Sequence, residues 1–287
     1  MPLEYSVTYC AENHYDRVVK NAIWQFLIIP EDNDNQELIS IVFENSLNIP
    51  TQYSINGFGF KTLRLHPRIA FTDVRFKAVF KLHKQNINPF DFIPGEEPSV
   101  SYGRLTSLEF MTTFQPFLCP TNFTRLPQAA DSSLFGFDRN ASIFDNLLAL
   151  NHWVYLHLYF QPGVTHVETI LEEILKSRKG VCQDFTHLFC AVARKNRIPV
   201  RYVSGYLHQG NGYFGDSQMH AWAEAYIPEA GWIGFDPTND ILAGDNHIKV
   251  AHGRDYQDCS PLKGIIFSPG NNRTTHSVEV MARQDQQ

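Results

Sequence analysis

The chain has 287 residues, a net charge of −6 and an isoelectric point near 6.0; 43% of its residues are hydrophobic and 19% are charged. These values are typical of a folded chain of about two domains and argue against extended disorder. Basic residues form no stripe, so the electrostatic footprint of a nucleic-acid or anionic-membrane binder is missing. We find no signal peptide and no apolar stretch long enough to span a bilayer, and we therefore expect a cytoplasmic protein.

The five cysteines form no pattern that predicts disulfide bonds. Their number is odd and their spacing irregular, whereas disulfide frameworks use even sets of cysteines in short secreted chains. A reducing compartment with free thiols is the simpler interpretation, and it leaves room for a reactive thiolate. The cysteines are Cys10, Cys119, Cys182, Cys190 and Cys259.

The first part of the chain predicts short β-strands separated by turn residues. The apolar or alternating runs cover residues 5–9, 22–29, 38–43, 57–63 and 78–82. This spacing is typical of an antiparallel β-sandwich. We therefore expect an N-terminal β-sandwich domain over residues 1–115, serving as a scaffold or a recognition domain, and a catalytic core over residues 116–287.

Helices are predicted from about residue 141 onward. Apolar spacings of three and four predict a helix over residues 141–160, and Thr165 with Glu168 resembles a capping box that opens a second helix ending at Gly180. A third helix is predicted to begin at about Cys182. Strands are predicted over residues 198–207, 220–227 and 231–236, the last two joined by a short turn. The expected fold class is α+β.

Cys182 is the candidate nucleophile. It follows Gly180, which predicts a helix end, and it opens an amphipathic helix. A helix N-terminus favours the thiolate form of a cysteine, and its free backbone N–H groups can bind an oxyanion. A cysteine at a helix start is, taken alone, more often a small buried core residue. The interpretation therefore depends on the residues downstream.

His220 begins one strand of a predicted hairpin and Asp236 ends the other, so the hairpin brings the two ends together. If the turn holds an odd number of residues, Asp236 pairs near Trp222, one diagonal step from His220 on the same face. An even turn would put the two side chains on opposite faces unless a bulge corrected the register. In the odd register His220 can serve as the base for Cys182, and Asp236 can orient the imidazole.

These residues lie in four segments that together resemble the transglutaminase-like superfamily. The segments are Gly180–His187, Arg201–Tyr206, His220–Trp222 and Gly231–Asn239. Residues 250–261 also look like the C-terminal signature of its bacterial branch, whose members are often described as proposed cysteine proteases. The resemblance covers most of residues 140–287 and, more loosely, residues 1–85.

The resemblance implies an N-terminal antiparallel β-sandwich followed by a papain-like core, in which helices pack on an antiparallel sheet. It also implies a catalytic triad of Cys182, His220 and Asp236 that works through a thioester intermediate. The chain departs from the C-terminal signature at His252 and Cys259, where smaller aliphatic residues are expected. This departure does not touch the triad.

Other candidate residues have a weaker basis. Gln183 and Trp222 are candidates for an oxyanion or substrate-binding role, although first-turn polar residues usually complement a helix end and Trp222 is equally well explained as a core aromatic. His187 lies about 140° around the helix from Cys182 and is expected to be structural. The spacing of Cys182, His187 and Cys190 matches no common zinc pattern, and no calcium loop is present. We therefore expect no metal and no cofactor.

The expected function is amide acyl transfer through a Cys182 thioester, most directly the hydrolysis of a peptide or related amide. An amine in place of water would make the same triad a transglutaminase. The alternative is a non-catalytic module that binds a peptide or another partner, which the intact nucleophile, base and acid disfavour. The expected partner is a peptide or protein amide substrate, with no nucleic acid and no membrane. The oligomeric state does not follow from the sequence.

Overall fold

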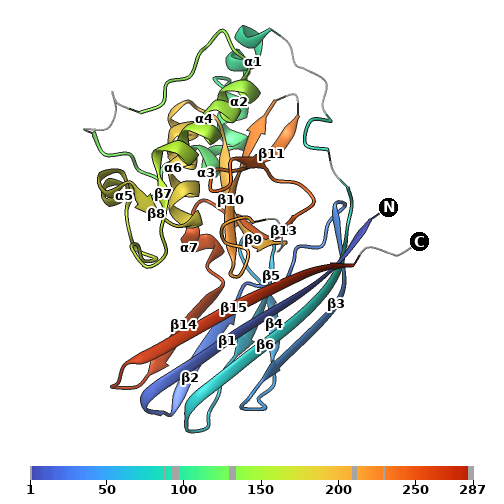
Figure 1. The fold of residues 1–287 in the computed structure, drawn as a ribbon, viewed down its shortest axis with the longest axis vertical. Coiled ribbons are helices and arrows are strands. Elements are labelled where there is room, and N and C mark those ends of the chain that lie inside the picture. The colour runs from blue at the N-terminus through green and yellow to red at the C-terminus, as the bar shows by residue number, and fades with distance from the viewer. Residues whose placement is uncertain are drawn as a thin grey trace.

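The computed structural model describes residues 2–86, 88–91, 97–128, 134–208, 212–228 and 230–283. Two parts pack against each other: a sandwich of β-strands, and a core in which helices cover a five-stranded sheet (Figure 1). This arrangement confirms the expected α+β class with antiparallel sheets and a β-rich N-terminal region. None of the described helices is long and apolar enough to cross a membrane.

The sandwich consists of two four-stranded sheets. The first has the order β15-β1-β6-β3, with bounds Asn272–Arg283, Leu3–Val19, Phe71–Lys84 and Gln36–Asn45. The second has the order β14-β2-β5-β4, with bounds Leu262–Phe267, Asn21–Phe26, Lys61–Leu65 and Gln52–Ile55. Trp24 and Phe26 of β2 meet Phe76 of β6, with ring centroids 5.1 and 4.8 Å apart. Alternate side chains of both sheets therefore share one apolar interior.

The two C-terminal strands complete the sandwich instead of extending the core. Strand β15 pairs antiparallel with β1 along its length, and β14 pairs antiparallel with β2. Figure 1 shows these orange and red strands beside the blue ones. The expected core over residues 116–287 therefore includes two strands that pair with the N-terminal sheets. Without β14 and β15, the strands β1 and β2 would be exposed edges, which are unfavourable in a soluble sheet.

Helices on the other side of the expected boundary pack on the core. They are α1 (Pro98–Arg104), α2 (Leu108–Thr113) and α3 (Gln115–Leu118). The rings of Phe110 and Phe114 lie 5.9 and 4.2 Å from that of Tyr226, and the Tyr102 hydroxyl accepts a hydrogen bond from Asn146 Nδ2 at 2.9 Å. The contacts therefore favour a division in which strands from both ends of the chain form the sandwich.

The core sheet has the order β12-β11-β10-β9-β13. Its strands are β9 (Val200–Leu207), β10 (His220–Ile227), β11 (Gly231–Asp236), β12 (Ile241–Leu242) and β13 (His247–Gly253). Helix α6 (Cys182–Lys195) packs on this sheet, where Phe189 stacks on Phe235 at 5.4 Å, and α4 (Ile143–His157) packs on α6. Burial of nearly all of α6 fixes its N-terminal end, and with it Cys182, against the sheet.

The segment between α4 and α6 differs from the predicted helix. It holds β7 (Tyr159–Phe160), α5 (Leu171–Ser177) and β8 (Lys179–Gly180), and the two short strands pair in parallel. Thr165 caps no helix, because its hydroxyl donates to Asp184 at 2.7 Å. Helix α5 ends at Arg178, whose φ of 55° lies in the left-handed region, before Gly180 is reached. The capping-box expectation was wrong because a distant carboxylate binds the hydroxyl.

We expect β15 to contribute strongly to stability. Val280 is buried with its side chain in the sandwich, whereas Glu279 beside it is exposed. Val280→Asp places an unpaired charge in the apolar interior and should lower the free energy of unfolding by on the order of 3–5 kcal/mol. Urea unfolding followed by fluorescence measures this. Glu279→Gln should change stability little, and equal effects of the two substitutions would contradict the docked position of β15.

Candidate active site

Cys182 is the first residue of α6 and lines a cavity between the sandwich and the core. The preceding residue, Val181, has extended backbone with φ −117° and ψ 179°, so the chain enters the helix abruptly. The first turn closes with Asp184 N–H donating to Val181 O at 2.8 Å. Backbone N–H groups at such a helix start lack intrahelical acceptors, so those of Cys182 and Gln183 are candidate oxyanion donors.

Asp184 holds this helix start in place. Its Oδ2 accepts from Val181 N–H at 2.8 Å and from the Thr165 hydroxyl at 2.7 Å. Burial raises the pKa of this carboxyl, and the two donors oppose that shift. A Cβ at position 180 would lie 2.6 Å from Asp184 Oδ2, so Gly180 permits the close approach. Asp184 therefore fixes the backbone of Val181, the residue that precedes Cys182.

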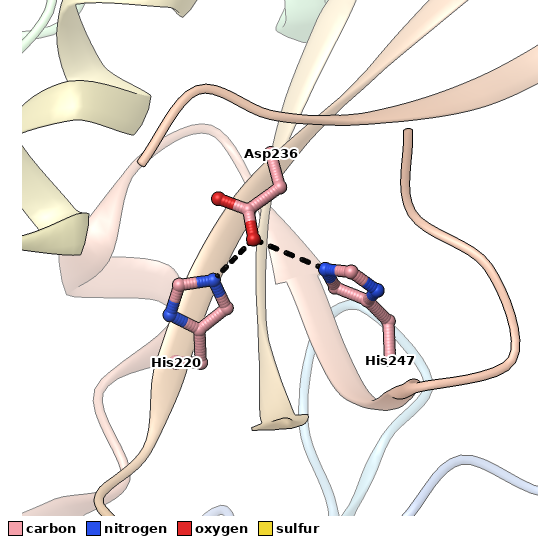
Figure 2. Close-up of side chains that lie close together, drawn as sticks. All are labelled: His220, Asp236 and His247. Carbon is pink, nitrogen blue, oxygen red and sulfur yellow. Dashed lines mark hydrogen bonds and ion pairs between the residues drawn. The ribbon is translucent and has the colours of Figure 1, made fainter. Parts of the chain in front are cut away.

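His220 and Asp236 meet as the odd-length turn predicts. Strands β10 and β11 pair from Ile227↔Gly231 to Ala223↔Phe235, which puts Asp236 opposite Trp222 in the next step. His220 Nε2 lies 2.8 Å from Asp236 Oδ2, and both side chains are fully buried (Figure 2). The predicted register is thus confirmed.

The other ring nitrogen of His220 faces the cavity end of α6. Nδ1 is buried; it makes no hydrogen bond within the usual distance limits, and it interacts with the Cys182 side chain. Burial alone would lower the pKa of His220, but the Asp236 carboxylate and the neighbouring Cys182 thiol group outweigh it and raise the pKa to about 10. Gly215 lies against this nitrogen, since a Cβ there would sit 2.6 Å from Nδ1. The side chains of His220 and Cys182 are therefore neighbours on the cavity wall.

Asp236 stays ionised because several donors surround it. Thr238 N–H donates to Oδ1 at 3.0 Å, and Asn239 donates through its side-chain Nδ2 to Oδ2 at 2.8 Å. Burial would raise the pKa of Asp236, yet the charge and the hydrogen bonds of His220, together with His247, lower it below its usual value. A carboxylate held in this way can orient His220 and stabilise its protonated form.

His247 is a site residue that the sequence did not reveal. Its Nε2 donates to Asp236 Oδ2 at 3.1 Å, and its Nδ1 accepts from Gly244 N–H at 3.3 Å (Figure 2). These two bonds assign the neutral tautomer with the proton on Nε2, and burial lowers the pKa of His247 accordingly. It begins β13, beyond an irregular connection from β11, so no periodicity or spacing signalled its contact with Asp236.

His220, Asp236 and His247 also form a set of side chains of the kinds that bind metals, with ligand atoms within 4.8 Å of one another. One carboxylate oxygen lies 2.8 and 3.1 Å from the two ring nitrogens. Ligand atoms about 2.0 Å from a tetrahedral zinc ion lie about 3.3 Å from one another, so both contacts are shorter than a shared zinc ion would set them. The observed distances are those of hydrogen bonds.

The remaining candidates differ in whether they line the cavity. Gln183 lines the cavity beside Cys182. Trp222 is 2% exposed and does not line that cavity. It packs edge-on against His247, with ring centroids 5.1 Å apart, and so helps to hold that ring in place. His187 is buried, accepts from Tyr256 N–H at 3.2 Å and stacks on an aromatic ring; burial lowers its pKa to about 3. His187 is structural, as expected.

Comparison with known proteins identifies the family. Residues 136–237 match the family model described as the transglutaminase-like superfamily. An uncharacterized protein of Mycobacterium leprae is 36% identical over 191 residues, which are 64% of this chain and 68% of that protein. The chain belongs to the transglutaminase-like superfamily. This membership supports a cysteine-dependent enzyme.

Three further proteins are similar to this superfamily member. A proposed cysteine protease of Cytophaga hutchinsonii shares the fold over 100% of this chain and 92% of its own, with a TM-score of 0.77 and 22% identity. A protein-glutamine gamma-glutamyltransferase of Pseudomonas aeruginosa is 31% identical over 87 residues, 28% of this chain and 13% of that protein. An uncharacterized Mycobacterium tuberculosis protein is 39% identical over 45% of this chain, which spans only 44% of its length.

The raised pKa of His220 predicts a pH dependence of stability. The folded protein keeps the proton up to pH about 10, whereas an unperturbed histidine loses it near 6.5. The stabilisation is therefore complete below pH 6.5 and is lost as the pH rises through 10. Urea unfolding at intervals from pH 6 to 10 should show a steeper decline in the wild type than in Asp236→Asn. Parallel declines in the two proteins would contradict the His220–Asp236 ion pair.

Gly215 provides a second test of the geometry. Its φ is +88°, and an added Cβ would press on His220 Nδ1. Gly215→Ala should therefore slow alkylation of Cys182 by roughly 10²-fold, the lower end of what a base contributes. Gly212 also has positive φ but has open space around it, so Gly212→Ala is the matched control. If Gly215→Ala is alkylated at Cys182 as fast as the wild type, the result would contradict a contact between His220 Nδ1 and the Cys182 thiol.

Proposed function

We propose that this chain is an amide acyl-transfer enzyme in which Cys182 is the nucleophile, His220 the base and Asp236 the orienting acid. The observation that carries the proposal is the two-sided placement of His220. One ring nitrogen is fixed on a buried carboxylate, and the other interacts with the cysteine at a helix N-terminus. This is the constellation that nucleophilic cysteine catalysis requires.

The reaction follows from these positions. In the reactive form the Cys182 proton already lies on His220 Nδ1, in keeping with the raised pKa of His220, and the thiolate attacks the amide carbonyl carbon. The oxygen of the tetrahedral intermediate takes the negative charge and accepts hydrogen bonds from the backbone N–H groups at the start of α6. The C–N bond then breaks, His220 delivers its proton to the leaving amine, and Cys182 holds the acyl group as a thioester.

Release of the acyl group decides the class of the enzyme. Attack by water, with its proton passing to His220, gives a carboxylic acid and restores the thiol, which makes the enzyme a peptidase or amidase. Attack by a primary amine gives a new amide and a transglutaminase. We propose hydrolysis of a peptide or related amide as the main activity. The glutamyltransferase similarity over 87 residues supports amine transfer as the second candidate.

A non-catalytic binding module is the competing function, and the site geometry argues against it. A groove that only binds a peptide needs neither a histidine beside a thiol nor a buried carboxylate on the other ring nitrogen of that histidine. Both are present here. The donors around Asp236 likewise maintain a charge that binding alone would not need.

Selective alkylation tests the nucleophile. With limiting iodoacetamide at pH 6, peptide mapping by mass spectrometry should place the adduct on Cys182, because a protonated His220 beside the sulfur favours the reactive thiolate. His220→Ala should lose this selectivity, by roughly 10²-fold or more in rate. Cys182→Ala should remove both the labelling and any turnover of an amide substrate.

The chain contains its own control for accessibility. Cys119 is exposed and Cys182 only partly so, whereas Cys190 and Cys259 are buried. Labelling governed by exposure alone would favour Cys119. Such a result in the folded wild type would refute an activated Cys182 and leave the binding module as the better function.

A further inference from the structure

The cavity beside Cys182 takes one wall from each part of the molecule. Its volume is about 580 Å³. The core supplies Cys182, Gln183 and His220, and strands β1, β2, β14 and β15 of the sandwich supply the facing wall. Side chains of that wall include Tyr9, Asn13, Tyr15, Trp24, Ile266 and Thr274. The sandwich therefore lies directly against the space in which the substrate must bind.

Apart from His220, whose charge is paired with Asp236, charged side chains are absent from the described lining. No Asp, Glu, Lys or Arg is among the described residues around the cavity, and its histidines are His220 and the exposed His276. Tyrosine, tryptophan and aliphatic side chains dominate instead. A charged group entering this space would give up its hydration without meeting a counterion, which is strongly unfavourable. Aromatic walls favour flat or apolar groups.

Two polar side chains on the cavity wall each have one atom without a hydrogen-bond partner among the described residues. Asn13 is 4% exposed; its Oδ1 accepts from the Thr274 hydroxyl at 2.5 Å, but its Nδ2 donates to no described residue. Ser204, also 4% exposed, has an unpaired hydroxyl. Buried polar atoms in folded proteins are nearly always paired. An unpaired amide donor on a cavity wall therefore points to an acceptor supplied by a ligand.

We propose that the acyl donor carries an uncharged, aromatic or apolar group that lies between Cys182 and the sandwich, and that a carbonyl oxygen of this group accepts a hydrogen bond from Asn13 Nδ2. The proposal rests on the proposed function and adds its substrate class. It also makes the N-terminal sandwich a substrate-recognition domain, with β1 supplying the polar contact.

Chloroacetamides with different tails test the charge preference. The Cys182 thiolate displaces chloride and forms a thioether, and intact-mass spectrometry gives the rate. Three reagents carry tails of equal length that end in a phenyl ring, a carboxylate or an ammonium group. The rate of each reagent is divided by the rate of unsubstituted chloroacetamide. On this scale, the phenyl reagent should react roughly tenfold or more faster than either charged reagent. Equal or faster labelling by a charged reagent would overturn the proposal.

The Asn13 contact requires a second pair of reagents. Both carry a phenyl-ended tail, and they differ only by an amide or a –CH2–CH2– unit in its middle. The wild type should prefer the amide reagent by roughly 3–10-fold, the range of a single hydrogen bond. Asn13→Leu should abolish this preference, and Asn13→Asp, which removes the donor at nearly constant shape, should do the same. A preference that survives both substitutions would refute the contact.

Matched controls separate this inference from the proposed function. Asn21→Leu makes the same change at an exposed position of β2 outside the cavity and should keep the wild-type preference. Thermal unfolding of each variant checks that it is folded. If unsubstituted chloroacetamide fails to label Cys182 selectively in the wild type, the proposed function fails. If it labels Cys182 selectively but the tails and Asn13 make no difference, only the substrate class is refuted.

Discussion

A single buried charge, the Asp236 carboxylate, governs the arrangement around the site. A carboxylate out of contact with water must be surrounded by donors or it becomes protonated. Here the donors come from three directions: His220 on β10, His247 on β13, and the turn that holds Thr238 and Asn239. The need to satisfy one charge therefore fixes the relative positions of neighbouring strands. The orientation of the His220 ring is one result of that constraint.

The sandwich contributes to the site in two ways. It forms a wall of the cavity, and it also holds β13 in place. Gln36 bonds to the backbone of Lys249, accepting from its N–H at 3.0 Å and donating to its carbonyl at 2.7 Å, and Lys84 donates to the carbonyl of His247. Because His247 bonds to Asp236, the N-terminal strands are connected to the orienting acid through two hydrogen bonds. The sandwich is thus part of the site's support.

Features set by residues that are close in the chain could be predicted from the sequence. Contacts between distant segments could not. The helix start at Cys182 and the register of His220 and Asp236 follow from periodicity and turn length, and the structure has both. The contact of His247 crosses an irregular connection whose path no spacing rule describes. The pairing of β14 and β15 with β2 and β1 joins opposite ends of the chain. An unpaired edge strand indicates that a partner is needed, but it does not indicate which segment of the chain is that partner.

The return of β14 and β15 to the sandwich has a consequence for the order of biosynthesis. The whole core, with Cys182, His220 and Asp236, precedes these strands in the chain, so it emerges from the ribosome first. The wall opposite the thiol is complete only when the last strand has docked on β1. A nascent chain therefore contains Cys182 before β15 can complete the cavity wall opposite it. Likewise, a proteolytic cut after α7 (Tyr256–Cys259) would leave the three residues in place and remove part of that pocket.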